Sequence, residues 1–488
     1  MPILNPGATA RITLQPGQVV SVNSGLGLVV EPGGQHTLNG GRELIGEFPR
    51  VTTVEITAQT AIDYIVEAGS NDEWKGIGGT EVVYDPANGS SSAGGSPVSG
   101  AGNSAAAISK IFSGAGTAIS LNTTIVTQHP ARRASFSAVK LVYGNWSTSG
   151  TITVTTCRVS PTPTHQNDGS ATTWTTIVLP SAGVVPQASG TGNDIVPGIL
   201  VSDVIPVASV ARTDDTTKNA LLQCRSYFAA AASGISLGGS DIAAFNASSA
   251  ASGMQFAART PAGDATATFT ASQQPLEAGS WIVPAGVIFY YPGVKSITLA
   301  SAGDSLQKGH LTTGGATGWV ERMAGLLCTS TVEVSPCVWA WTGQTHAASI
   351  SIARSLITTL KPTYLVFAAW SPNDAAAGSH TQAIFDAGLA RALDLIEYCR
   401  QNGVKPVIVT CMPWNGLTQA ESDRRRALNA TLRTLSNVAR IVDAAAVLED
   451  PANPKNMVSW GDSGDGLHPN DAGHAAVATA AAAGGPLA

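Results

Sequence analysis

The pattern of apolar and polar residues changes along the chain and divides it into regions. The first 86 residues carry short runs in which apolar and polar side chains alternate, such as ARITLQ and TVEITA, separated by Pro-Gly, Gly-Gly and Asn-Gly pairs. Alternation with a period of two is typical of strands with one buried face, and these pairs are typical of turns. The pattern predicts a small N-terminal β domain over residues 1–86.

The next segment, residues 87–107, reads ANGSSSAGGSPVSGAGNSAAA and consists almost entirely of Gly, Ser and Ala. Such small side chains bury too little apolar surface to offset the entropy lost on ordering, so we predict a linker here. Strand-like runs then resume, among them SFSAVKLVYGNW and GSWIVPAGVIFYYPG, with few helical patterns. They predict a β-sandwich, jelly-roll-like in its connections, over residues 108–292, with carbohydrate binding as a role for it.

The last region, residues 293–488, has a different period. Apolar runs of strand length, such as SITLASA, TYLVFAAW and KPVIVTC, alternate with helical segments such as QAIFDAGLARALDLIEYCRQNG. This alternation is typical of βαβ units around a parallel sheet that is buried on both faces. We therefore predict a C-terminal α/β domain and expect functional side chains at the carboxyl ends of its strands.

Composition excludes several classes of function. Charged residues make up 12% of the chain and the net charge is −6, which argues against a basic surface for nucleic acid. The N-terminus lacks a basic segment followed by an apolar one, and no run reaches the roughly 18–20 apolar residues of a membrane span. We expect neither a signal peptide nor membrane insertion. The six cysteines form no C-x-x-C pair, so we expect free thiols, no metal site and no cofactor.

One candidate for chemistry is Ser305, in the turn that follows SITLASA. A serine becomes a good nucleophile only when a base takes its proton. Near the C-terminus, the Gly-rich stretch GDSGDGLHPNDAGH holds Asp465 and His468 three residues apart, close enough for the carboxylate to orient the imidazole. Parallel topology brings this turn to the same sheet edge as Ser305.

Two rivals stand beside this pair. Asp462 lies in the same loop as Asp465 and competes for the imidazole. His474 competes with His468, although it falls where the last helix is expected and has no carboxylate three residues before it.

Hydrolysis also requires hydrogen-bond donors for the developing oxyanion. Two later strand ends offer them: the backbone N–H of Gly343 in WAWTGQT, and the side-chain amide of Asn373 in WSPND. Trp341 and Trp370 beside them either stack on a sugar ring or pack at the strand ends. His310 and His346 are further candidates for the cleft entrance, with surface or core positions as the alternative.

Taken in order, these residues resemble the four sequence blocks of the SGNH, or GDSL, hydrolase family. The blocks are Gly303-Asp304-Ser305-Leu306, Gly343, Asn373-Asp374 and Asp465-x-x-His468-Pro469. The resemblance implies a flavodoxin-like sheet and ester hydrolysis, with Ser305 as nucleophile, His468 as base and Asp465 as its partner. It also implies an oxyanion hole formed by Ser305, Gly343 and Asn373.

Two positions depart from the family pattern. Ser371 stands where the third block has Gly, and aromatic residues replace the Asn that precedes the Gly of the second block. The first change affects the turn or the width of the cleft, and the second leaves Gly343 the weakest of the assignments.

We therefore expect a serine esterase that removes acyl groups, O-acetyl above all, from a polysaccharide. Two β modules, a linker and a composition rich in small residues resemble phage tail spikes and tail fibres. That resemblance implies assembly in the host cytoplasm, a homotrimer, a place in the virion tail and attachment to other tail proteins through residues 1–86. A cytoplasmic or non-classically secreted protein is the alternative location.

Two other functions remain open. The first is a glycan-binding adhesin or tail fibre whose hydrolase-like domain is degenerate, because the departures at Ser371 and around Gly343 weaken the oxyanion hole. The second is a lipase or thioesterase, for which activity should persist on long acyl chains.

Overall fold

The computed structural model describes the backbone of the strands between residues 3 and 68 and of residues 101–106, and most of 123–229, 284–312 and 318–484 with side chains, together with residues 264 and 266. Gaps within these ranges fall at 132, 164–172, 193 and 214–218. The chain divides into two compact units, residues 1–93 and residues 94–487.

The first unit contains two four-stranded antiparallel sheets. Their strands lie on the alternating runs of the sequence, as the pleat of a strand with one buried face requires. The attachment role expected for residues 1–86 stays a prediction. In spatial order the strands are β1 (Ile3–Leu4), β8 (Ile62–Ala68), β3 (Gln18–Ser24) and β6 (Glu43–Ile45) in one sheet, and β2 (Thr9–Leu14), β7 (Thr52–Ala58), β4 (Leu26–Glu31) and β5 (Gly34–Asn39) in the other.

The second unit begins with two antiparallel sheets that face each other across an apolar layer. Side chains such as Leu141, Val159, Leu222 and Phe289 fill this layer. The first sheet has the order β10 (Thr123–Pro130), β18 (Leu221–Phe228), β13 (Thr156–Thr162), β14 (Thr175–Ile177). The second has the order β16 (Gly198–Val201), β11 (Ala138–Asn145), β19 (Gly286–Pro292), β9 (Ala101–Ala106), and β17 (Ile205–Pro206) also pairs with β11. A ribbon of β12 (Ile152–Thr153) and β15 (Val184–Val185), with the short helix η2 (Pro180–Gly183), completes this part.

The linker predicted over residues 87–107 is wrong at its C-terminal end. Residues 101–106 form strand β9 and pair antiparallel with β19. A strand is held by backbone N–H and C=O groups, so a run of Ala, Gly and Ser can join a sheet whose other strands supply the buried side chains. Residues 87–100 lie outside the described residues.

The C-terminal part is a five-stranded parallel sheet, as the sequence predicts. Its spatial order is β21 (Val332–Ala340), β20 (Lys295–Gly303), β22 (Tyr364–Ala368), β23 (Lys405–Val409), β24 (Arg440–Val442). Because β20 comes first in the chain and lies inside the sheet, the order reverses beside it, and such a reversal opens a crevice at the carboxyl ends of the strands.

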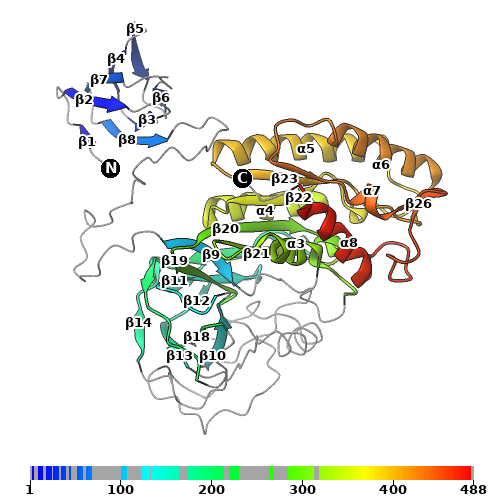
Figure 1. The fold of residues 1–488 in the computed structure, drawn as a ribbon, viewed down its shortest axis with the longest axis horizontal. Helices are drawn as coiled ribbons and strands as arrows, with labels where there is room; N and C mark the ends of the chain where they lie inside the picture. Colours follow the sequence, from blue (N-terminus) through cyan, green and yellow to red (C-terminus); the bar gives the residue numbers. More distant parts are fainter. Residues whose placement is uncertain are drawn as a thin grey trace. The chain divides into compact units, whose positions relative to one another are not determined.

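Helices cover both faces of this sheet (Figure 1). Leu365 and Phe367 of β22 pack toward α4 and α5, whereas Tyr364 and Val366 pack toward α3 and α8. Strand residues thus alternate between two cores, which explains the continuous apolar runs. The helices are α2 (Ser305–Lys308), α3 (Trp319–Leu327), α4 (His346–Leu360), η4 (Pro372–Asp374), α5 (Gln382–Gln401), α6 (Gln419–Leu432), α7 (Ala444–Leu448) and α8 (Asp471–Ala482), and a hairpin of β25 (Glu449–Asp450) and β26 (Asn453–Met457) follows α7.

The sandwich and the α/β part share one hydrophobic cluster. Val142 and Ile288, on the outer face of the second sandwich sheet, join the same cluster as α4 and β21. Trp146 stacks on Trp339 with ring centroids 5.9 Å apart. Residues 94–487 are accordingly one compact unit, and the boundary at 292/293 marks a change of topology.

Two general properties can be read from the described residues. None of the helices in that part of the chain has the length and apolarity of a membrane span. All six cysteines carry free thiols, and five of them are buried.

Replacement of Trp146 by Ala should lower the free energy of unfolding by about 3–5 kcal/mol, because a large buried side chain leaves a cavity in the shared core. Guanidinium denaturation measures the effect. The control is V178A, because Val178 is 88% exposed. A W146A loss as small as that of V178A would refute a shared core.

Candidate active site

Ser305 follows the first strand of the parallel sheet and is the first residue of α2. Asp304 caps this helix: its carboxylate accepts a hydrogen bond from the Leu306 N–H at 2.9 Å, and the Gln307 side chain accepts one from the Asp304 N–H at 3.2 Å. A Cβ on Gly303 would lie 2.5 Å from the Gln307 side chain, so any larger residue here would displace the side chain that completes the cap. The tetrapeptide is therefore a strand-to-helix turn that presents Ser305 at the sheet edge.

The structure brings Ser305, His468 and Asp465 together in one chain of hydrogen bonds. The Ser305 hydroxyl lies 2.8 Å from His468 Nε2, and His468 Nδ1 lies 2.5 Å from Asp465 Oδ2. Burial alone raises the pKa of Asp465, but hydrogen bonds from the His468 ring and from the backbone N–H groups of His468 and Leu467 outweigh it and lower the pKa to about 2. An ionised Asp465 only accepts, so Nδ1 carries the proton and Nε2 is left to accept from Ser305.

Of the two carboxylates in the loop, Asp465 contacts the imidazole and Asp462 shapes the backbone. Asp462 Oδ1 accepts hydrogen bonds from the N–H groups of Gly464 and Gly466 at 2.8 and 3.0 Å. An isolated bridge between Asp462 and Pro469 joins the two ends of the loop. Asp462 therefore holds the turn that presents Asp465 and His468.

The other histidines have different surroundings. His474 is fully buried in α8 and its Nδ1 accepts a hydrogen bond from the Trp319 N–H at 3.2 Å. His346 is buried too, with its Nε2 3.0 Å from the Ala368 carbonyl oxygen. His310 does lie at the site, because its ring packs edge-on against the His468 ring with centroids 4.9 Å apart.

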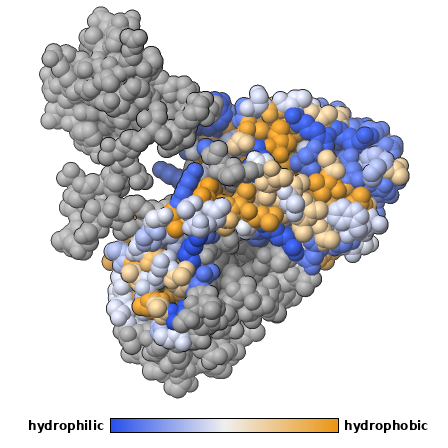
Figure 2. Space-filling model, in the orientation of Figure 1, coloured by the Kyte–Doolittle hydropathy of each residue, from blue (hydrophilic) through white to orange (hydrophobic). Residues whose placement is uncertain are grey.

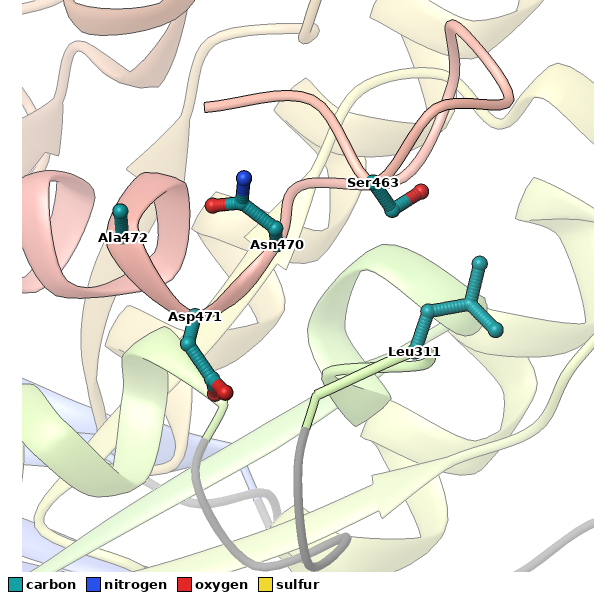
Figure 3. A pocket seen from close by; sticks show the side chains of 5 residues that line it. All are labelled: Leu311, Ser463, Asn470, Asp471 and Ala472. Atoms are coloured by element: carbon teal, nitrogen blue, oxygen red, sulfur yellow. The ribbon is translucent and has the colours of Figure 1, made fainter. Parts of the chain in front are cut away.

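A cavity of about 500 Å³ opens on one side of the His468 loop. Leu311, next to His310, faces Ser463 and Asn470 across it (Figure 3). The cavity therefore lies between the segment that follows α2 and the His468 loop.

Asn373 lies in η4, directly after β22. Its side-chain amide donates to the Gln344 carbonyl oxygen and to the Ser371 hydroxyl oxygen, each at 3.1 Å. Both amide hydrogens of Asn373 thus have acceptors within the protein. An oxyanion can accept from this amide only if it takes the place of the Gln344 carbonyl oxygen or the Ser371 hydroxyl oxygen. Gly343 lies in the turn after β21 with φ of 81°. The oxyanion roles of Ser305, Gly343 and Asn373 stay predictions.

Ser371, where the family pattern has Gly, links the two turns of the site. Its hydroxyl lies 2.5 Å from Asp304 Oδ2 and 3.0 Å from the Gln344 carbonyl oxygen, and it accepts from the Asn373 N–H at 3.2 Å. Ser371 and Asp304 are 2% and 3% exposed. Burial raises the pKa of Asp304 to about 6, although the hydrogen bonds from Ser371 and Leu306 act in the opposite direction.

The prediction that Trp341 and Trp370 bind a sugar is wrong. They are 5% and 3% exposed and belong to the core between the sheet and its helices. Trp370 stacks on Phe385 and donates its indole N–H to His380. The alternative, packing at the strand ends, describes both residues. The exposed tryptophan near the site is Trp460, which the sequence analysis did not single out.

Among the described residues, no group of three or more His, Cys, Asp or Glu side chains is arranged to hold a metal ion.

A nucleophile, an imidazole and a carboxylate in this order, at the edge of a parallel α/β sheet, define a site of the serine-hydrolase class. Residues 301–476 match the model of the GDSL-like Lipase/Acylhydrolase family, which supports a GDSL-type domain in the C-terminal region.

Two of the solved structures to which this chain is similar are a lipolytic protein and a carbohydrate esterase. A putative lipolytic protein of the G-D-S-L family from Desulfitobacterium hafniense shares 18% identity over 38% of this chain and 98% of its own, with a TM-score of 0.32. A carbohydrate esterase family 3 structure from Talaromyces cellulolyticus shares 15% identity over 38% of this chain and 93% of its own, with a TM-score of 0.30. No curated protein matches the chain.

Replacement of Ser371 by Ala should lower the free energy of unfolding by about 1–3 kcal/mol, because it removes a buried partner of Asp304. Urea denaturation at neutral pH measures the change. S349A is the matched control, since the buried Ser349 hydroxyl binds the Thr345 carbonyl oxygen of the same helical segment. If S371A and S349A lower the free energy of unfolding by the same amount, the hydrogen bond from Ser371 to Asp304 adds no stability of its own.

The stability conferred by Asp304 should depend on pH. Its pKa is about 6 when folded and 3.8 ordinarily, so the folded protein holds the proton more tightly than the unfolded chain. The contribution is complete below about pH 4 and is lost as the pH rises through about 6. The free energy of unfolding of wild type minus that of D304N should fall over this range in denaturation series. A difference that rises with pH would contradict the assignment.

Proposed function

We propose that the C-terminal domain is a serine esterase that removes acyl groups, O-acetyl in particular, from a polysaccharide. The observation that carries the proposal is the hydrogen-bonded chain from Ser305 through His468 to Asp465.

Each residue has a role in the proposed reaction. His468 Nε2 takes the hydroxyl proton as Ser305 Oγ attacks the ester carbonyl carbon, and ionised Asp465 stabilises the imidazolium that forms. The resulting oxyanion accepts hydrogen bonds from the Ser305 N–H, the Gly343 N–H and the Asn373 amide. His468 then gives the proton to the departing sugar oxygen, and a water molecule activated by His468 hydrolyses the acyl-enzyme.

A small acyl group suits the surroundings of the nucleophile. Ser305 is 3% exposed, and Leu306, Gln307 and Lys308 beside it are buried as well. A buried nucleophile leaves little space for the acyl side of the ester, whereas the alcohol side can extend over the loop surface. The limited space around Ser305 supports an acetyl ester as the substrate, in preference to the long-chain esters that a lipase or thioesterase cleaves.

The wider context belongs to the same proposal. The antiparallel β unit at the N-terminus suits attachment to other tail proteins of a phage, in a homotrimer located in the virion tail. The sandwich, which shares a core with the hydrolase domain, suits a part that orients the enzyme on a glycan.

Replacement of Ser305 by Ala should reduce kcat/KM for p-nitrophenyl acetate by about 10³-fold or more, because the nucleophile is lost. S351A is the control, since Ser351 is an exposed serine on α4. Wild-type protein should also release acetate from acetylated polysaccharide, with activity falling steeply on p-nitrophenyl esters of longer acids.

Other outcomes select other functions. No hydrolysis of any ester by wild type would favour the glycan-binding adhesin. Full activity in S305A would refute the nucleophile, and activity that persists on long acyl chains would favour a lipase or thioesterase.

A further inference from the structure

A polar groove lies beside the loop that carries His468. It has a volume of about 390 Å³, and its lining includes Asn415, Asp450, Asn456, Ser459, Trp460 and Asp462. Trp460 is 52% exposed and is the only exposed tryptophan among the described residues. This indole is therefore open to a ligand, unlike those of Trp341 and Trp370.

The groove is joined to the proposed active site through the same loop. Gly466, two residues before His468, forms part of the groove wall. The Asn415 N–H donates to the Gly466 carbonyl oxygen at 3.0 Å, and a Cβ on Gly466 would lie 1.9 Å from Asn415 Nδ2. The Asn415 side chain thus rests directly against the segment that holds the base.

Trp460 has a fixed place at the start of this loop. Asn470 donates its two amide hydrogens to the carbonyl oxygens of Trp460 and Asp462, each at 2.9 Å. The Asn470 side chain also accepts from the Gly473 N–H at the start of α8. The backbone that carries the indole is therefore tied to the last helix, which limits how far this part of the groove wall can move.

The chemistry of the lining identifies the class of ligand. An aromatic face covers the apolar C–H face of a sugar ring, while amides and carboxylates bond its hydroxyl groups. An acyl chain needs an apolar lining, whereas hydrophilic residues cover the end of the domain where β26 lies (Figures 1 and 2). Asp450 and Asp462 add negative charge, and no lining residue is basic, which disfavours an anionic sugar.

We propose that this groove binds an uncharged sugar unit of the acylated polysaccharide, with Trp460 as its stacking platform, while a neighbouring unit presents its ester to Ser305. This assignment rests on the proposed esterase function. It makes Trp460 a specificity residue that acts on the alcohol side of the ester.

The test compares substrates with and without a sugar. In W460A, kcat/KM for p-nitrophenyl acetate should stay within about twofold of wild type, because that ester does not reach the groove. KM for acetylated glucomannan oligosaccharides should rise at least about tenfold, and W460F should restore most of the loss. L393A is the matched control, since Leu393 is 39% exposed on α5 and is not part of the groove. Acetylated pectin, which is anionic, should be a poorer substrate than acetylated glucomannan.

A binding measurement separates this inference from the esterase proposal. Calorimetry with the unacetylated neutral oligosaccharides mannohexaose, cellohexaose and xylohexaose needs no catalysis, and at least one should bind wild type more tightly than W460A. If wild type and W460A bind these oligosaccharides equally, or if wild type binds none of them, the assignment of the groove to a sugar is refuted, even if acetate release continues. A wild type that cleaves p-nitrophenyl acetate but no acetylated polysaccharide would refute the polysaccharide substrate instead. A W460A loss on p-nitrophenyl octanoate, or a preference for pectin, would also overturn the assignment.

Discussion

The hydrogen bond between Ser305 and His468 is the interaction on which the proposed chemistry of the C-terminal domain depends. It joins side chains 163 positions apart, so it exists only if the whole parallel sheet forms between them. The sheet places β20 inside its order and brings the later strand ends to the same edge. Asp462 and Asn470 then hold the final loop, which presents the imidazole to the hydroxyl.

Next to Ser305, the buried side chains of Asp304 and Ser371 are hydrogen-bonded to each other, and this pairing holds the nucleophile turn in place. Asp304 has lost most of its contact with water, and its partners are the Leu306 N–H and the Ser371 hydroxyl. A buried carboxyl group without such partners would be costly. The serine that replaces the glycine of the family pattern therefore connects the nucleophile turn to the Asn373 turn, and it does not disrupt either of them.

The proposed substrate groove and the proposed catalytic residues lie on different parts of the same loop. One side faces the cavity between Leu311 and Ser463, and the other forms a wall of the polar groove with Trp460. The sandwich is joined to the far side of the sheet through Trp146 and Trp339. This contact makes the sandwich and the sheet parts of one hydrophobic core.

The sequence by itself determined the features that depend on near neighbours in the chain. The turn around Ser305 follows from Gly303, Asp304 and Gln307, and the Asp465–His468 pair follows from a spacing of three residues. The apolar runs of strand length that alternate with helical segments likewise predicted the parallel sheet. Only the tertiary structure decided which tryptophans are open, that residues 101–106 join a sheet, and that Ser371 binds Asp304 from 67 positions away. The physical reason is that burial and long-range pairing depend on atoms from distant segments, whereas capping and short turns are complete within a few residues.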